Sequence, residues 1–389
     1  MRDDRDHRGT STPHADGVVL VTGATGLLGS LVVQRWASQP HPPRLAVLVR
    51  DPARWHATAR RLGIPAGAAV ALDGDVTRAG MGLPCAARAW LAERATALVH
   101  LAADTSFSRP LGEARRTNRD GARHLLDVAD ACPHVTRVAL VSTAFVAGRR
   151  TGPVPESAAG AATPDVGWVN AYEQSKAEGE ALVRAARTDW LVLRSSTVAC
   201  DDATGAVTQR NAVHRALRLV HGGLAAMIPG VPGATLDVVP ADHVADAIAR
   251  LALRAGVDGE TVHLCAGAGA LPLDELLDAS FARWERDLAW RRRGVERPSL
   301  GDLETWELFV RTVDETGNPR LRAVAHALSH FLPQLALPKR FETARAEALL
   351  GAGAPPVRDY WGRMLDHLDA TGWRGVAGLT EIDPTEVAA

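Results

Sequence analysis

Short apolar runs alternate with stretches of helical spacing through the N-terminal half of the chain. An apolar run of ~4–8 residues is typical of a buried strand, and apolar residues three and four apart are typical of an amphipathic helix. We expect strands at 18–21, 44–49, 70–72, 96–101, 137–142 and 190–193, with helices at 31–36, 52–62, 85–94, 111–130 and 169–187. This alternation predicts an α/β fold, a Rossmann-like doubly wound parallel sheet with helices on both faces.

The first strand leads into a glycine-rich turn. Gly23, Gly26 and Gly29 follow Val18–Val21, and an apolar stretch of helical spacing comes next. Glycine allows the tight bend, lets a pyrophosphate approach the backbone, and lets the helix pack closely on the strand. The N–H groups at the start of that helix then favour a phosphate. The turn therefore predicts a dinucleotide site, although its GxxGxxG spacing is a weak signal alone.

The pattern loosens beyond residue 197. Helices are expected at 207–221, 242–253 and 273–284, and short strands at 237–240 and 262–264. The apolar segment 331–337 is interpreted as a helix packed on the domain. We divide the chain into a disordered tail (1–16), a dinucleotide-binding domain (17–200, with sheet elements from about 236–265), and a smaller, mostly helical substrate-binding or lid region (201–235 and 266–389).

Arg50 stands where the second strand ends and indicates which dinucleotide is bound. An acidic residue at this position would bind the ribose 2′-hydroxyl of NAD, whereas an arginine accommodates the 2′-phosphate of NADP. Asp51 follows directly and makes the signal mixed. We favour NADP(H), with Arg54 as a second phosphate ligand.

Tyr172 and Lys176 lie four residues apart, on one face of an expected helix. A phenol is a poor acid–base catalyst at neutral pH, and a neighbouring ammonium is expected to lower its pKa. Thr143, at the end of the fifth strand, offers a hydroxyl to a substrate carbonyl oxygen. Since side chains alternate along a strand, Ser142 is not expected to reach the same site. A solvated tyrosine and lysine and a loop-capping hydroxyl are the alternatives.

Composition excludes several classes of protein. The chain has 389 residues, with 44 basic and 45 acidic side chains, so nucleic-acid binding is not expected. Its four cysteines are scattered singly, which predicts neither a metal site nor a disulfide framework and fits a reducing cytoplasm. No apolar run reaches the ~18 residues that span a bilayer. The charged N-terminus lacks the apolar core of a signal peptide.

The order of the motifs resembles that of the extended short-chain dehydrogenases/reductases (SDRs) across roughly residues 17–265. Within that family the sequence is similar to the fatty acyl-CoA reductase and thioester reductase branch, the male sterility-like NAD(P)-binding proteins. The motifs are TGATGLLG at 22–29, Arg50, DGDV at 73–76, HLAADTSF at 100–107, Asn118, VSTAFVAG at 141–148, Tyr172 with Lys176, and VPADHVA at 239–245.

The resemblance implies a role for each matching residue. It implies a catalytic set of Thr143, Tyr172 and Lys176, the last two also contacting the cofactor. The other cofactor ligands that it implies, from the pyrophosphate and 2′-phosphate through the adenine to the nicotinamide end, are Thr22, Gly23, Thr25, Gly26, Leu27, Leu28, Gly29, Arg50, Arg54, Asp75, Val76, Leu101, Ala102, Ala103, Ser195, Ser196, Thr197 and Val198. Family members often carry proline after the arginine of the sixth strand, whereas Ser195 follows Arg194 here.

The resemblance implies an NADPH-dependent reductase that transfers a hydride to a carbonyl, with an acyl thioester on CoA or an acyl carrier protein as the leading substrate. The alternatives are a ketone or aldehyde reductase with the same residues, an NAD-dependent nucleotide-sugar epimerase or dehydratase, and a non-catalytic NADP-binding scaffold. Arg291–Arg293 is interpreted as a solvated run, with a carrier protein or CoA phosphate as its alternative partner. A homodimer is a further expectation.

Overall fold

The computed structural model describes residues 17–374, apart from the side chains of Arg320 and Ala327. The predicted tail, 1–16, lies outside the described residues. A seven-stranded parallel sheet forms the centre of the molecule, in the order β12-β7-β5-β4-β1-β2-β3. Its strands are β1 (Val18–Thr22), β2 (Arg44–Val49), β3 (Ala69–Asp73), β4 (Ala95–His100), β5 (Arg137–Thr143), β7 (Asp189–Ser195) and β12 (Glu260–Leu264).

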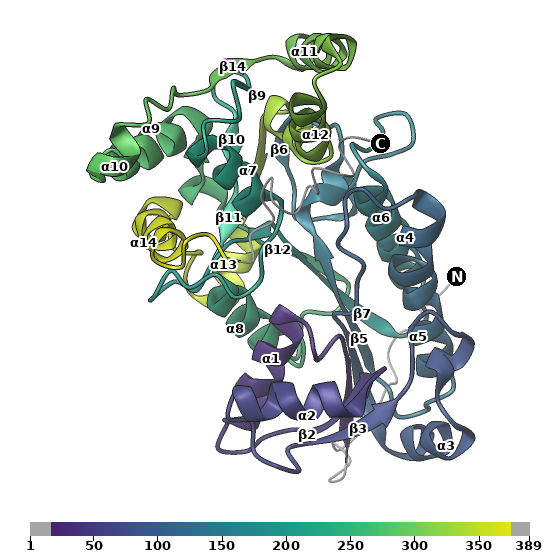
Figure 1. The fold of residues 1–389 in the computed structure, drawn as a ribbon. Coiled ribbons are helices and arrows are strands. Elements are labelled where there is room, and N and C mark those ends of the chain that lie inside the picture. The colour runs from purple at the N-terminus through teal and green to yellow at the C-terminus, as the bar shows by residue number, and fades with distance from the viewer. Residues whose placement is uncertain (1–16, 375–389) are drawn as a thin grey trace.

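Helices cover both faces of this sheet (Figure 1). Those on one face are α1 (Leu27–Ala37), α2 (Pro52–Arg61) and α8 (Ala241–Leu251), and those on the other are α3 (Cys85–Arg94), α4 (Leu111–Asn118), α5 (Asp120–Asp130) and α6 (Ala171–Arg184). Side chains of β1 alternate between the two layers: Val19 and Val21 pack with the first group, and Leu20 packs with the second. The predicted doubly wound architecture is confirmed.

The strand order reverses between β1 and β4, and crevices that bind ligands form at such a reversal. β1 continues into α1, and β4 continues into the segment that starts at Leu101. The predicted helix 111–130 is α4 followed by α5. Only a distortion at Arg119 divides them, and its backbone remains in the helical region.

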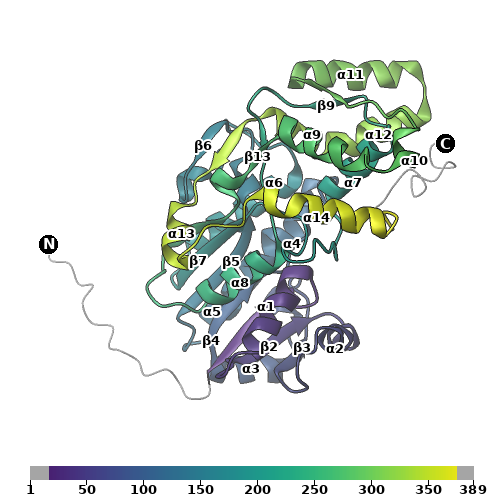
Figure 2. The same cartoon turned by 90° about the vertical axis from the view of Figure 1, so that its left-hand side faces the viewer.

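The C-terminal half adds β12 to the edge of the sheet. Its other elements are helices and short paired strands outside the central sheet. Its helices are α7 (Ala212–His221), α9 (Leu273–Trp284), α10 (Leu288–Arg291), α11 (Leu303–Thr316), α12 (Pro319–Ser329), α13 (Ala344–Leu350) and α14 (Val357–Ala370). Figure 2 shows α9–α12 gathered at one end of the molecule, with α2 and α3 at the other. Within residues 17–374, no helix combines the length and apolar character that crossing a membrane requires.

Four two-stranded pairings tie this half together. They are β6 (Gly152–Val154) with β15 (Lys339–Phe341), β8 (Thr197–Val198) with β11 (Val238–Val239), β9 (Met227–Pro229) with β14 (Ser299–Gly301), and β10 (Thr235–Leu236) with β13 (Leu271–Pro272). The predicted helix 207–221 starts only at Ala212, because the Asn211 side chain caps it by accepting from Val213 N (3.0 Å). Segment 331–337 is a buried 3₁₀ turn packed on the domain, as expected.

Candidate active site

The glycine turn after β1 has the geometry of a phosphate cradle. Gly23 has φ +74°, which favours glycine, and a Cβ there would meet Ala102 N at 2.6 Å. A Cβ on Gly29 would meet Gly23 O at 2.2 Å, so the helix can pack this closely only with glycine. Gly26 caps α1 without a side chain, and the first turn of α1 carries no acidic residue. The N–H groups at this terminus are therefore suited to a pyrophosphate.

Thr22 and Thr25 belong to the glycine turn but do not line the cavity at the carboxyl ends of the strands. The Thr22 hydroxyl bonds His100 Nδ1 (2.8 Å) and accepts from Ala102 N (3.2 Å), so it joins the ends of β1 and β4. Thr25 is half-buried. The structure thus gives Thr22 a role in fixing the turn, and Ala102 acts there through its backbone.

A cavity of about 800 Å³ opens at the carboxyl ends of the strands. It is bounded by the glycine turn, the segments after β4 and β5, the start of α6, the segment after β7, and residues from the C-terminal half. Of the predicted site residues it is lined by Gly23, Gly26, Leu27, Leu28, Gly29, Leu101, Ala103, Thr143, Tyr172, Lys176, Ser195, Ser196, Thr197 and Val198.

Thr143 and Tyr172 come together in this cavity from the end of β5 and the start of α6. Burial raises the pKa of Tyr172 to about 12, and the hydrogen bond with the Thr143 hydroxyl lowers it only in part. The expected lowering by Lys176 is wrong for this structure, because burial of the phenol raises its pKa and the one opposing contribution comes from the Thr143 hydroxyl. Tyr172 is thus a neutral phenol over the physiological pH range, a donor rather than a base.

Lys176 lies one turn further along α6 and is 3% exposed. Its Nζ donates to Val141 O (2.8 Å), at the end of β5. Burial lowers the pKa of Lys176 to about 8, while the negative charge of Glu180 raises it. Burial, together with the positive charge of Lys176, lowers the pKa of His100 to about 3. The lysine is therefore a buried cation in the wall of the cavity.

Asn118 fixes the segment after β4. Its amide Nδ2 donates to Asp104 O (3.0 Å) and to the Ser175 hydroxyl (2.9 Å), and its Oδ1 accepts from Asp104 N (2.9 Å). The sequence marked Asn118 only as part of a motif. In the structure it ties the pocket wall at Asp104 to the helix that carries Tyr172.

Arg50 and Asp75 lie near the carboxyl ends of β2 and β3, and neither they nor Arg54 line the cavity. Burial raises the pKa of Asp75, but hydrogen bonds from Thr77 and the charges of Arg50 and Arg78 bring it below its usual value. Asp51 caps α2 by accepting from Ala53 N (2.9 Å) and Arg54 N (3.2 Å). The mixed signal of the sequence is thereby explained, since Asp51 serves the helix. Arg50 and Arg54 are exposed beside it.

Val76 is 8% exposed and packs in the core between the sheet and α5, so its side chain belongs to that core. Its carbonyl bonds His124 Nδ1 (2.8 Å). The structure thus connects Val76 to α5, and only its backbone remains for an adenine contact.

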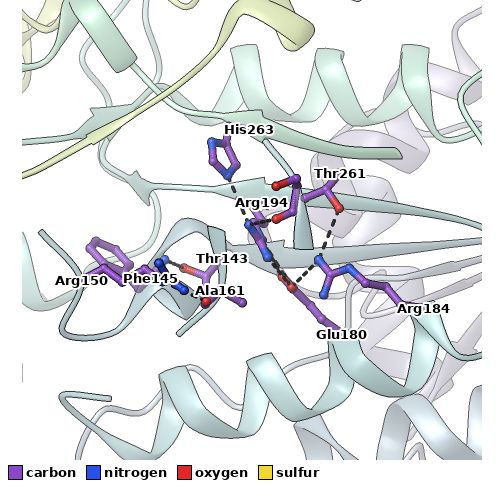
Figure 3. A network of polar contacts seen from close by, with 10 residues as sticks. Thr143, Phe145, Arg150, Ala161, Glu180, Arg184, Arg194, Thr261 and His263 are labelled. Atoms are coloured by element: carbon purple, nitrogen blue, oxygen red, sulfur yellow. Dashed lines mark hydrogen bonds and ion pairs between the residues drawn. The ribbon is translucent and has the colours of Figure 1, made fainter. Parts of the chain in front are cut away.

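A buried ion pair supports the wall behind Lys176. Arg194 in β7 and Glu180 in α6 are both fully buried and form a two-pronged contact, with Nη2–Oε2 at 2.8 Å and Nε–Oε1 at 3.0 Å. Figure 3 shows Arg194 between Glu180 and His263. Burial alone would raise the pKa of Glu180, but the charges of Arg194 and Arg184 lower it. Ser142 lines the cavity together with Thr143, so the expectation that alternation along the strand keeps it out is wrong; its buried hydroxyl has no hydrogen-bond partner among the described residues.

Comparison with known proteins identifies the family. The family model described as "Male sterility protein", a class of NAD-binding domains, matches residues 21–248, more than half of the chain. The chain belongs to this family. The resemblance to the extended SDRs and their male sterility-like branch is thereby confirmed, and with it the class of enzyme, an NAD(P)-dependent oxidoreductase.

Relatives of this male sterility family member are parts of large synthases. It is 36% identical over 138 residues to the iterative polyketide synthase afoE of Emericella nidulans. The matched region covers 31% of this chain and 5% of the synthase. It is 28% identical over 260 residues to the hybrid PKS-NRPS synthetase mycA of Thermothelomyces thermophilus, covering 63% of this chain and 6% of the synthetase. The chain thus spans a small fraction of the length of both relatives.

Solved structures share its fold. The terminal R domain of the myxalamid PKS-NRPS pathway matches with a TM-score of 0.75 at 23% identity over 94% of both chains. The reductase (R) domain of a nonribosomal peptide synthetase from Mycobacterium tuberculosis matches with a TM-score of 0.63 at 23% identity over 93% of both. MoeE5, solved with UDP-glucuronic acid and NAD, matches with 0.60 at 17% identity over 91% of this chain and all of that one.

This family member also brings residues to the cavity that sequence reasoning did not assign. Phe107 packs against Tyr172 (ring centroids 5.3 Å) and stacks on Phe331 (5.8 Å), and Phe145 meets Phe331 edge-on (6.4 Å). Other lining residues come from the region expected to cover the substrate: Gln209, Arg210, Asn211, Ala212, Arg215, His326, Leu328, His330 and Leu332. No motif marks them, because they meet the site only through the tertiary fold.

Proposed function

We propose that the protein is an NADPH-dependent reductase that converts an acyl thioester to an aldehyde and a free thiol. One observation carries this: the Thr143 hydroxyl, the neutral phenol of Tyr172 and the buried cation Lys176 line the same cavity as the glycine turn. The proposed cofactor site and the side chains that would polarise a substrate carbonyl thus line the same cavity. The regions 201–235 and 266–374 supply its remaining wall, which supports their role in binding substrate.

Two hydrogen-bond donors, Thr143 and Tyr172, and one positive charge, Lys176, act on the substrate carbonyl. Thr143 and Tyr172 hold the carbonyl oxygen by hydrogen bonds, and Tyr172 gives it a proton as negative charge develops there. Lys176, positively charged at neutral pH, stabilises the phenolate that remains. When bound, NADPH would supply the hydride. Hydride added to the carbonyl carbon and a proton added to its oxygen would give a hemithioacetal; its carbon–sulfur bond would then break, and the hydroxyl proton would pass to sulfur, leaving an aldehyde and a thiol.

Arg50 and Arg54 support NADPH over NADH. Both residues are exposed, Arg50 after the end of β2 and Arg54 in the first turn of α2. The charge of Arg50 helps to lower the pKa of Asp75, and Asp51 is engaged as a helix cap. Guanidinium groups match the geometry of a phosphate. Nucleotide-sugar epimerases, one alternative, usually carry a free acid here, so the capping role of Asp51 speaks against that alternative.

We predict that Arg50→Glu weakens NADPH binding about 10- to 100-fold and leaves NADH binding within a few fold, since charged hydrogen bonds contribute roughly 1.5–3 kcal/mol. Fluorescence titration with both cofactors measures this. Arg61→Glu, the same charge change on an exposed residue at the far end of α2, is the control and is expected to change neither affinity. An equal loss of NADPH and NADH affinity in Arg50→Glu would contradict the assignment.

The thioester is proposed to arrive on a phosphopantetheine arm, of a carrier protein or of CoA. Arg210 and Arg215 line the cavity, while the carboxylate of Asp104, also in the lining, is paired with Arg109 (2.8 Å). The two arginines suit the phosphate of such an arm. One structure of similar fold is a thiolation-reductase di-domain from an archaeal nonribosomal peptide synthetase, with a TM-score of 0.66 at 17% identity. Arg291–Arg293 is exposed, and its role as a docking site, like the homodimer, stays a prediction.

NADPH oxidation by the purified protein tests the function. The panel pairs acyl pantetheine thioesters with the matching aldehydes and ketones, and adds nucleoside-diphosphate sugars. We expect NADPH loss with thioesters, accompanied by an equivalent amount of free thiol. NADPH loss with ketones or aldehydes alone would replace the proposal with the ketone or aldehyde reductase, and conversion of a sugar nucleotide without net NADPH loss would replace it with the epimerase.

A further inference from the structure

A small apolar cavity lies beyond the wall of the main one, between α7 and α9. Its volume is about 40 Å³, and its lining is apolar, with Leu217, Leu276 and Leu277 among it. The one hydroxyl in that lining, on Ser280, donates to Leu276 O (2.6 Å) and accepts from Trp361 Nε1 (3.0 Å). The lining therefore offers little to water, and an apolar group can bury its surface there.

Phe331 and Leu332 line both this cavity and the active-site cavity, so the two spaces adjoin at these two side chains, which we call the partition. On the active-site side, Phe331 stacks on Phe107, whose ring packs against Tyr172. An apolar path of rings therefore leads from the catalytic phenol to the small cavity.

A buried polar network fixes this partition to the catalytic helix. Glu173, next to Tyr172, bonds the Gln334 amide, and Lys339 Nζ donates to Gln334 Oε1 (2.6 Å). Asn170 Nδ2 donates to His330 O (3.2 Å), directly before Phe331. These hydrogen bonds fix the position of Phe331 relative to Tyr172. A site that selects substrates by length requires such a fixed distance.

We propose that the small cavity receives the apolar end of the acyl group whose carbonyl lies at Tyr172, and that Phe331 sets how far this end can reach. This inference rests on the proposed thioester reductase function. A volume of about 40 Å³ exceeds the ~10–15 Å³ that one water needs, so it holds a few heavy atoms. The preferred acyl group accordingly ends in a short or branched alkyl group and carries no charge at that end.

Ala216→Leu tests this proposal, because Ala216 lines the small cavity and not the main one, and a leucine fills it. The ligands are non-reducible amides of cysteamine with acyl groups from acetyl to dodecanoyl, titrated calorimetrically with NADP⁺ bound. Wild-type affinity is expected to rise with acyl length by up to about fourfold per buried methylene, until the cavity is full. In Ala216→Leu we expect a loss of about tenfold or more, confined to amides that are long enough to reach the cavity.

Two variants complete the experiment. Ala89→Leu makes the same change on the exposed face of α3 and is expected to leave the whole series as in the wild type. Phe331→Ala opens the partition, so the optimum should move to longer or bulkier acyl groups. A melting temperature for Ala216→Leu at or above that of the wild type excludes misfolding as the cause.

The outcomes separate the inference from the function on which it rests. A wild-type affinity that does not rise with acyl length, or an Ala216→Leu series equal to that of the wild type, would overturn the inference even if thioesters are reduced. Selective amide binding without reduction of any thioester would instead overturn the proposed function. In that case the cavity would remain a site for an apolar chain end.

Discussion

Tyr172→Phe is expected to lower the rate of thioester reduction by about 10²–10⁴-fold, the usual contribution of a positioned general acid. The phenol is buried beside Thr143 and its pKa is raised to about 12, so it is a donor whose loss leaves the developing oxyanion with Thr143 alone. Affinity for NADPH should change little, because the ring and its packing on Phe107 are retained. Single-turnover kinetics with saturating NADPH measures the effect.

The chain supplies a matched control in its other tyrosine. Tyr360 is fully buried, and its hydroxyl donates to Val238 O (2.7 Å), at a distance from the cavity lining. Tyr360→Phe should therefore lose about 1 kcal/mol of stability and keep its turnover. Equal activity of the two variants would remove Tyr172 from the mechanism.

Glu180→Gln is expected to lower the free energy of unfolding by about 3–5 kcal/mol. The substitution leaves the guanidinium of Arg194 buried without its counter-charge, and the cost of desolvating such a charge is large. Both side chains are fully buried and in two-pronged contact, and the Nη2 of Arg184 also donates to Glu180 (2.8 Å). Urea unfolding monitored by tryptophan fluorescence measures the change.

Glu178→Gln, the same change two residues earlier on α6, is the control for the loss of stability in Glu180→Gln. Glu178, also on α6, bonds Arg115 Nε (2.7 Å), but both side chains are partly exposed. Glu178→Gln should cost at most about 1 kcal/mol, as solvent-exposed pairs do. If the two variants lose similar stability, the buried pair does not hold the wall behind Lys176.

Much of the nucleotide half could be predicted from sequence because its signals are local. The apolar run before Gly23 and the glycines themselves determine a strand, a turn and a helix within one short stretch. Tyr172 and Lys176 are four residues apart, so one helix brings both to one face without help from the rest of the chain. The order of these segments then implied the sheet, which the structure confirms.

What depends on distant contacts could not be predicted. Phe331 stacks on Phe107, whose ring packs against Tyr172, and β6 is a strand because β15 pairs with it from a segment far along the chain. The predicted direction of the Tyr172 pKa shift was also wrong, because the burial that raises this pKa is set by the whole surrounding fold.

The fate of the hydride tests the central claim most directly. The protein is incubated with an acyl pantetheine thioester and NADPH that carries deuterium at both C4 positions, the product is analysed by mass spectrometry, and free thiol is measured. We predict one deuterium at the former carbonyl carbon of an aldehyde, and one thiol for each NADPH consumed. Unlabelled product, or labelled product without thiol release, would contradict thioester reduction by this protein.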